Sequence, residues 1–183
     1  FILNVANKVA FKANDQFGNP IKVSGSIENQ NGKVVGKINP IHDGMGFVMI
    51  TPKAGETYTA KWIDEQKKTH TSNLPKPSEG VTLQITGESS KRKFELLSSE
   101  ATRTDMAYIV GTMYGQIVFK IQNTFANGKI EGLIPTKDLP SGILTITAFD
   151  HLSRPTSERI IFINNHEYTF SPDVEVMHWG INK

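Results

Sequence analysis

The sequence contains no cysteine among its 183 residues. This absence excludes disulfide bonds, cysteine nucleophiles, thiolate zinc sites and iron–sulfur clusters. The chain also lacks any run of the roughly 18 apolar residues that a membrane-spanning helix requires, and it shows no signal peptide. It begins Phe1-Ile2-Leu3, without a methionine and already with the character of a strand. We therefore expect an excised piece of a larger protein, for which the missing signal sequence is uninformative.

A strong excess of one charge is absent too. The chain carries 20 Lys and Arg against 18 Asp and Glu, for a formal net charge of +2. Nucleic-acid binding usually needs a concentrated basic stripe, and the densest basic run here is Lys91-Arg92-Lys93. This triplet follows serines and indicates a solvated linker or strand edge. No nucleic-acid partner is therefore expected.

Helical periodicity is nearly absent. The best candidate lies around residues 98–106, where Thr102, Thr104 and Asp105 disfavour a helix. Short segments of alternating apolar and polar residues occur throughout the chain instead, and they predict β-strands. A first set of strands is predicted at residues 8–13, 23–27, 47–51, 58–63 and 81–86. A second set is predicted at residues 94–98, 107–112, 116–122, 129–134, 142–150 and 158–164.

Turn signals separate these strands, among them Asn31-Gly32 and Asn127-Gly128. Short strands with a turn roughly every 8–12 residues indicate a β-sandwich or barrel. About a dozen strands are too many for one compact sheet pair, whereas two modules of about 90 residues match Ig-like domains. The sequence thus predicts an all-β fold of two tandem antiparallel β-sandwiches, at residues 1–86 and 87–166. Residues 167–183 are expected to form a strand or linker toward a following domain.

Several residues indicate turn or core positions. In Asp43-Gly44-Met45-Gly46, the two glycines are free to take positive φ, which is expected to redirect the chain before a buried strand. Glu158 and Arg159 open a late strand, where neighbours point to opposite faces, so one of them is expected to anchor a loop or an inter-domain contact. The remaining turn or core positions are Gly18, Pro52, Gly55, Pro140 and Gly142.

Short motifs follow one another in a definite order along the chain. The first half contains Gly18-Asn19-Pro20, Asp43-Gly44-Met45-Gly46-Phe47 and Ala54-Gly55-Glu56-Thr57-Tyr58. The second half contains Leu139-Pro140-Ser141-Gly142, Thr147-Ala148-Phe149-Asp150 and Glu158-Arg159-Ile160-Ile161-Phe162. Together they resemble successive macroglobulin-like domains over most of residues 9–164. They are especially similar to domains of bacterial envelope proteins that precede a TonB-receptor-type plug domain.

The resemblance implies two macroglobulin-like β-sandwiches in the periplasm or at the cell surface of a Gram-negative bacterium, associated with the outer membrane. The thioester of the alpha-2-macroglobulin family joins a Cys and a Gln outside such domains, and this chain has no cysteine to form it. The resemblance therefore implies scaffold and interaction roles only. The expected partners are neighbouring domains of the same polypeptide and another envelope protein or a glycan.

The histidines show no metal-binding spacing. The five histidines are His42, His70, His151, His166 and His178. No two of them stand at positions i and i+2, as two ligands on one strand would, or at i and i+4, as two ligands on one helix would. A site assembled across strands stays open. His42-Asp43 resembles a base and its orienting carboxylate, but the following Gly44 favours a turn. The oxygen-rich segment from Asp15 to Asn19 similarly favours a plain turn over a calcium loop, because no bidentate Glu follows.

Aromatic residues offer one alternative. Tyr58 and Trp62 are spaced to share a strand face with Ala60 and are candidates for stacking on a sugar ring, although a core role is favoured. No set of nucleophile, base and orienting residue can be named. We therefore expect a protein without catalytic residues, metal or cofactor, serving as a spacer or protein-binding segment. The alternative is a carbohydrate-binding pair of modules in a surface glycan-utilisation system.

Overall fold

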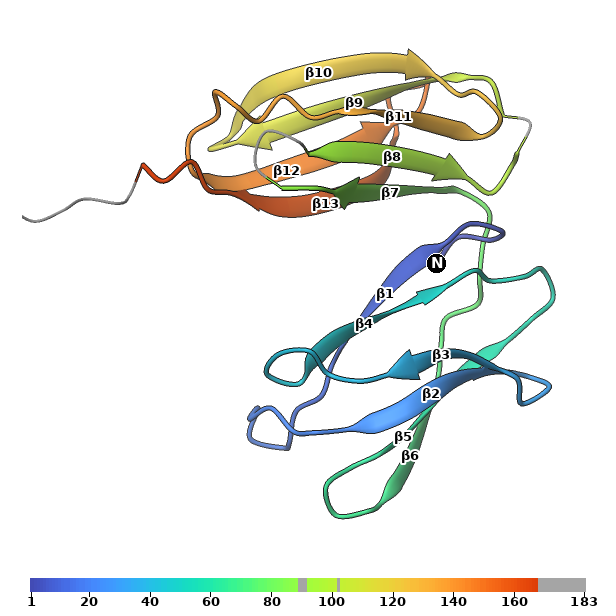
Figure 1. Ribbon diagram of the computed structural model, residues 1–183. Helices are drawn as coiled ribbons and strands as arrows, with labels where there is room; N and C mark the ends of the chain where they lie inside the picture. The colour runs from blue at the N-terminus through green and yellow to red at the C-terminus, as the bar shows by residue number, and fades with distance from the viewer. Residues whose placement is uncertain (89–91, 102, 168–183) are drawn as a thin grey trace, which may run out of the picture.

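The computed structural model describes residues 1–88, 92–101 and 103–167 (Figure 1). These residues contain no helix, and every pairing between their strands is antiparallel. The predicted all-β fold is confirmed. The strands are β1 (Asn7–Lys12), β2 (Ser24–Asn29), β3 (Val34–Ile38), β4 (Met45–Ile50), β5 (Tyr58–Ile63), β6 (Thr69–Asn73), β7 (Val81–Thr86), β8 (Lys93–Ser98), β9 (Met106–Met113), β10 (Gln116–Thr124), β11 (Lys129–Leu133), β12 (Gly142–Phe149) and β13 (Pro155–Ile163).

Strands β1–β6 form one pair of facing sheets, which we call the N-terminal sheet pair. A two-stranded sheet, β1-β4, lies over a four-stranded sheet in the order β3-β2-β5-β6. The two sheets enclose a hydrophobic cluster of buried residues: Val23, Ile27, Ile38, Val48, Ile50 and Tyr58. Phe11, Ala60 and Trp62 pack against this cluster and are only partly buried.

Strands β7–β13 form the C-terminal sheet pair. A three-stranded sheet, β11-β8-β7, faces a four-stranded sheet in the order β10-β9-β12-β13. Side chains point alternately to the two faces of a strand, and this alternation determines which residues enter the core. In β9, partly buried and buried residues alternate, with Ala107 and Ile109 turned inward. The cluster between these sheets is separate from the first and contains Leu83, Phe94 and Ile146, each at most 1% exposed.

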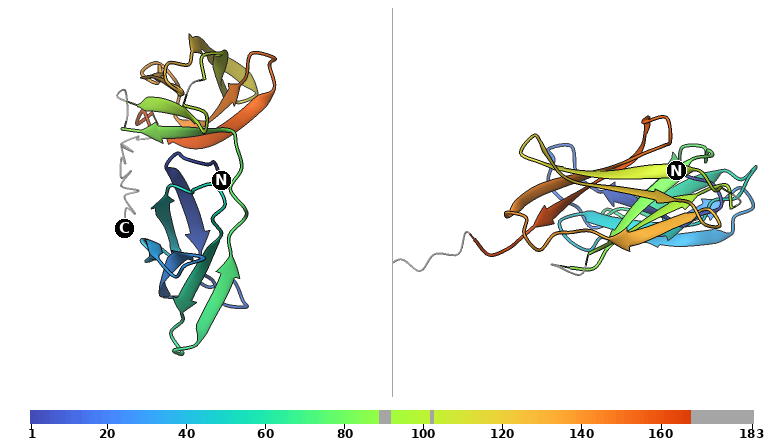
Figure 2. Two further views of the ribbon diagram at one scale, coloured as in Figure 1. Left: turned by 90° about the vertical axis from the view of Figure 1, so that its right-hand side faces the viewer. Right: turned by 90° about the horizontal axis from the view of Figure 1, so that it is seen from above.

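The two sheet pairs follow each other along the long axis of the molecule (Figure 2). Residues 74–80 lead from β6 into β7. Side chains also join the two pairs, since Gln84 Nε2 on β7 donates a hydrogen bond of 2.6 Å to the carbonyl oxygen of Ala6.

Strand β7 corrects one assignment. Residues 81–86 were predicted to complete the first set of strands, but β7 pairs with β8 through the register Leu83↔Leu96. Val81 and Leu83 are buried in the C-terminal cluster. The predicted assignment of this strand is therefore wrong, and the sheets change between β6 and β7, before Gly87.

Two strands and one turn also differ from the prediction. Strands β3 and β6 were not predicted. In the turn before β4, Asp43 and Gly44 take positive φ, at 44° and 72°. Gly46 does not take positive φ; it lies in β4, where a Cβ would come within 2.5 Å of Phe11 Cζ and 2.8 Å of the Asn39 carbonyl oxygen. Gly46 thus provides space for the Phe11 ring and does not use the positive φ that was open to it.

Candidate functional site

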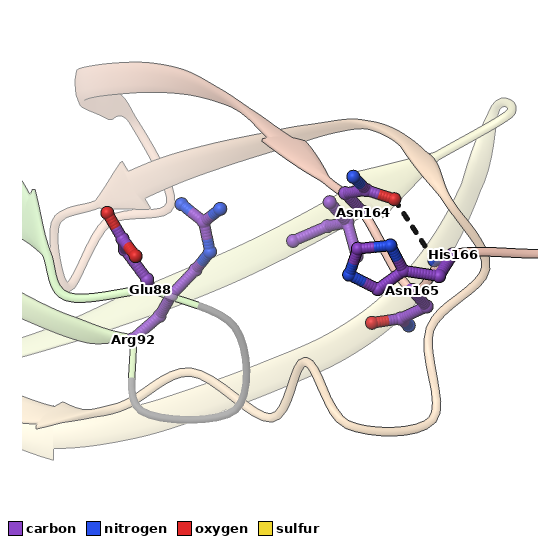
Figure 3. A pocket seen from close by; sticks show the side chains of 6 residues that line it. Glu88, Arg92, Asn164, Asn165 and His166 are labelled. Atoms are coloured by element: carbon purple, nitrogen blue, oxygen red, sulfur yellow. Dashed lines mark hydrogen bonds between the residues drawn. The ribbon is translucent and has the colours of Figure 1, made fainter.

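A polar pocket of about 250 Å³ opens beside the end of β13 (Figure 3). Glu88 and Arg92 lie on one side of it, and Asn164, Asn165 and His166 lie on the other. Ile163 also lines the pocket. The side chains offer hydrogen-bond donors and acceptors.

Hydrogen bonds to the backbone fix this pocket. Arg92 Nη2 donates to the carbonyl oxygen of Phe162 at 2.7 Å, and Asn164 Oδ1 accepts from the His166 amide at 3.0 Å. Asn165 Nδ2 donates to the Leu139 carbonyl oxygen, and the backbone N–H of Asn165 donates to Ser141 Oγ at 2.8 Å. Asn165 thus holds the end of β13 against the entry of β12, and Arg92, the residue before β8, binds β13. The pocket therefore has a structural explanation, and it presents no nucleophile paired with a base.

A second cavity, of about 310 Å³, lies in the N-terminal sheet pair and is mainly apolar. Its walls come from the end of β1, from β5 and from β6; they include Phe11, Ala13, Ala60, Trp62 and Ser72. Val23 and Ile38, two buried residues of the cluster, form its floor. The cavity exposes part of the N-terminal core, and we call it the β1 groove.

The two residues predicted to stack on sugar lie in different surroundings. Both are on the inward face of β5, as the spacing predicted, but Tyr58 is only 3% exposed. Its hydroxyl donates to Glu56 Oε2 at 2.6 Å and accepts from the Lys53 amide at 2.9 Å. Tyr58 is therefore a core residue and offers no ring face to a ligand. Trp62 lines the β1 groove and stacks on His70, with ring centroids 5.5 Å apart.

The histidines of the described residues do not gather into a metal site, and no group of three or more His, Asp and Glu suited to a metal occurs in this part of the chain. His42 Nε2 and Asp43 Oδ2 lie 3.0 Å apart at the turn before β4, where a turn was predicted. His70 Nε2 lies 2.7 Å from Asp64 Oδ2, and the hydrogen bond from His70 lowers the pKa of Asp64. His178 lies outside the described residues.

A charged cluster that the sequence did not predict joins two loops of the C-terminal sheet pair. Asp105 accepts hydrogen bonds from Arg103, at 2.7 Å for Nη2, and lies 3.1 Å from Nδ1 of His151. The hydrogen bonds from Arg103 hold the pKa of Asp105 below its ordinary value. Asp105 contacts both Arg103 and His151, so the cluster ties the 103–105 loop to the turn after β12.

The predicted turn at Asp15 has a similarly structural arrangement. Asp15 Oδ1 accepts from the amides of Phe17 and Asn19, both at 2.8 Å, and Oδ2 accepts from Asn19 Nδ2 at 3.0 Å. Its carboxylate oxygens thus bind N–H groups of their own turn. Gly18, with φ of 88°, completes the turn.

The other predicted turn and core residues lie at strand ends. Pro52 is fully buried after β4, Gly55 takes φ of 77° before β5, and Gly142 takes φ of 153° at the start of β12 beside exposed Pro140. On β13, Glu158 Oε2 accepts from Thr147 Oγ1 at 2.9 Å, and Arg159 Nη1 donates to the Glu158 carbonyl oxygen at 3.0 Å. Glu158 therefore contacts the neighbouring strand β12.

Comparison with known proteins adds little. No family model and no curated protein matches the chain. Among solved structures, it is similar to a tetra-tandem repeat in the extending region of a large adhesion protein, with 12% identity, 87% of this chain and 50% of that chain covered, and a TM-score of 0.38. It is also similar to the BSP domain of a biofilm-associated protein, with 13% identity and a TM-score of 0.38; the match covers 92% of this chain and 29% of that chain. The chain thus spans half or less of these proteins, and likeness at this distance carries no argument about function.

No helix among the described residues is long and apolar enough to cross a membrane.

Proposed function

We propose that the two sheet pairs are tandem, non-catalytic β-sandwich domains that act as a spacer or protein-binding segment of a larger bacterial envelope protein. The observation that carries this proposal is the separation of the hydrophobic core into two clusters, each enclosed by its own pair of sheets. A domain with its own core can be placed in series with others, and a series of such domains sets a distance. We place the division between the domains at residues 74–80.

The macroglobulin-like resemblance and the location in the periplasm or at the cell surface belong to the same proposal. They rest on the order of sequence motifs quoted above. The polar pocket and the charged cluster support a role without catalysis, because Arg92 Nη2, Asn165 and Asp105 hold loops and strand ends together through hydrogen bonds. Among the described residues, Arg92 Nε is buried without a hydrogen-bond partner.

The carbohydrate-binding alternative has weaker support. A stacking platform needs an open aromatic face. Tyr58 is buried, and one face of Trp62 is covered by the ring of His70.

A distance measurement tests the spacer role. The chain lacks cysteine, so Asn31→Cys and Leu152→Cys, both at exposed turns of different sheet pairs, place two spin labels without background. Asn31→Cys with Gln66→Cys, both in exposed turns of the N-terminal sheet pair, is the matched reference. A spacer predicts that electron–electron double resonance gives a distance distribution about as narrow for the first pair as for the second. A broad distribution for the first pair alone would contradict a spacer.

A further inference from the structure

Among the described residues, the hydrophobic core does not continue from one sheet pair into the other. The buried side chains form two separate clusters, each enclosed by its own sheets. A cavity of about 660 Å³ opens at the junction, lined by Leu3 and Ala54 from the N-terminal part of the chain and by Ser99 and Arg103 from the C-terminal part. Domains without a large apolar interface move relative to each other by default. A fixed orientation of the two sheet pairs therefore depends on polar contacts at the junction.

Residues 1–6 form a loop beside the segment that leads from β6 into β7 (Figure 1, Figure 2). We call it the joint loop. Ile2 and Ser78 form a parallel bridge between the loop and this segment. The Leu3 amide donates to the Ser78 carbonyl oxygen, and the Ser78 amide donates to the Phe1 carbonyl oxygen, both at 3.0 Å. The joint loop is thus paired with the connection between the two sheet pairs.

One buried side chain gives the joint loop its shape. Asn7, at the start of β1, is only 5% exposed. Its Oδ1 accepts from the Ile2 amide at 2.8 Å, and its Nδ2 donates to the carbonyl oxygens of Ile2, at 2.7 Å, and of Val5, at 2.8 Å. Both hydrogens on Nδ2 and the side-chain oxygen are therefore used within the loop. Asn7 is the residue that folds the joint loop back on β1.

The joint loop also contacts the C-terminal sheet pair. Gln84 Nε2, on β7, donates to the Ala6 carbonyl oxygen at 2.6 Å. Ala6 immediately precedes Asn7, so the carbonyl group that Gln84 binds belongs to the loop that Asn7 shapes. Leu83, the neighbour of Gln84, points into the C-terminal cluster, and Gln84 therefore projects from the opposite face of β7. This hydrogen bond joins the two sheet pairs directly, without the connecting segment.

The connecting segment is also bonded to the C-terminal part of the chain. The Gly80 amide donates to Ser99 Oγ at 3.0 Å, and the Ser99 amide donates to the Gly80 carbonyl oxygen at 2.9 Å. Gly80 takes φ of 149°, and a Cβ there would lie 3.0 Å from Ile2 Cδ1 of the joint loop. Glycine thus permits both the backbone conformation and the close approach of the loop. The segment is held at Ser78 by the joint loop and at Gly80 by Ser99.

We infer that the joint loop fixes the orientation of the two sheet pairs, with Asn7 shaping the loop and Gln84 binding it from the C-terminal sheet pair. The loop does so because it is bonded both to the connecting segment and to β7. The alternative cause of a fixed orientation is the stiffness of the connecting segment itself, which contains Pro75 and Pro77. The inference rests on the proposed function and deepens it by naming the residues that give the spacer one orientation.

Removal of these contacts tests the inference. Q84M keeps the length of the side chain but removes the donor to Ala6, and N7A removes the three hydrogen bonds that shape the loop. Both variants keep the two prolines. Spin labels at Asn31→Cys and Leu152→Cys report the distance between the sheet pairs in each variant. Electron–electron double resonance should give a distance distribution about twofold wider or more than in the parent, because two domains joined by a linker alone move independently.

Two reference pairs of labels separate a freed junction from a damaged fold. Asn31→Cys with Gln66→Cys, within the N-terminal sheet pair, should keep its width in N7A. Lys137→Cys with Leu152→Cys, both at exposed turns of the C-terminal sheet pair, should keep its width in Q84M. If N7A widens the first reference, the N-terminal sheet pair itself is disturbed, and the result for Q84M decides.

Gln116 supplies a matched control for Q84M. It is exposed at the start of β10, which lies on the side of the C-terminal sheet pair away from the junction (Figure 1). Q116M makes the same chemical change as Q84M at a site without contact to the joint loop. It should leave the distribution between positions 31 and 152 unchanged.

Two results overturn the inference while the spacer role stands. The first is a narrow distribution in the parent that stays equally narrow in Q84M, which would assign the fixed orientation to the prolines. The second is equal widening by Q84M and Q116M. A broad distribution in the parent itself would contradict the spacer role, so the two failures are distinguishable.

Discussion

Phe11 of β1 lies directly across from Gly46 of β4, and its ring covers the space where a side chain at Gly46 would be. The same relationship occurs between Phe94 and Gly132 in the other sheet pair, where a Cβ at Gly132 would lie 2.7 Å from Phe94 Cε1. An aromatic ring laid over a glycine of the neighbouring strand pairs the two strands in one register. The cores of both sheet pairs depend on these cross-strand pairs.

Substitution of Gly132 tests this dependence. Phe94 is only 1% exposed and cannot move aside, so G132A should lower the free energy of unfolding by about 1–3 kcal/mol through overpacking. Urea unfolding measures the change. The double variant G132A/F94L should lose less unfolding free energy than the sum of the losses in the two single variants, because the smaller side chain at position 94 relieves the clash. Strict additivity would show that the ring and the glycine are not coupled.

The Tyr58 hydroxyl is expected to stabilise the turn before β5. Y58F removes the acceptor of the Lys53 amide and the donor to Glu56, and should cost about 1–2 kcal/mol in unfolding free energy. Y108F is the control, because Tyr108 is half-buried and faces Lys120 with its ring; its loss of a hydroxyl should be nearly neutral. Equal effects of the two substitutions would contradict this role.

The cluster around Asp105 predicts a pH dependence. Its pKa is lowered in the folded state by the hydrogen bonds from Arg103, so its contribution to stability is present above the unfolded pKa near 4. That contribution is lost as the pH falls through the lower folded-state pKa. D105N should therefore show a shallower loss of stability than the parent between about pH 4 and pH 2. Identical pH profiles from thermal unfolding would contradict the assignment.

Trp62 tests the carbohydrate-binding alternative. A glycan that stacks on the Trp62 ring should lose all binding in W62A. A glycan array run on the parent and on W62A measures this. Glycan binding that disappears in W62A would support the carbohydrate-binding alternative, whereas glycan binding that persists in W62A would contradict it.

Local pattern predicted most of the strands and failed where strands are short and lie at a sheet edge. β6 reads Thr-His-Thr-Ser-Asn and has no apolar residue to alternate. β3 includes Gly36, and Ile38 is its only buried residue. Both are edge strands. Their existence depends on pairing with β5 and β2, which no local pattern encodes.

Long-range relationships were the other limit. The alternation in Val81–Thr86 shows that the segment is a strand but does not say which sheet it joins. The charged cluster unites Asp105 and His151, which lie 46 positions apart in the chain. The β1 groove is lined by Phe11, Ile38 and Trp62, which come from three different strands, so no local pattern brings them together.

The division of the chain into two domains is the central claim, and residue-resolved hydrogen exchange of a core variant tests it most directly. Ile146 is fully buried in the C-terminal cluster, and I146A should destabilise that cluster by about 2–5 kcal/mol. Two domains predict faster exchange throughout β7–β13, including Leu83 and Ile85, with little change in β1–β6. Faster exchange in all thirteen strands together, or protection of β7 along with β1–β6, would contradict the account.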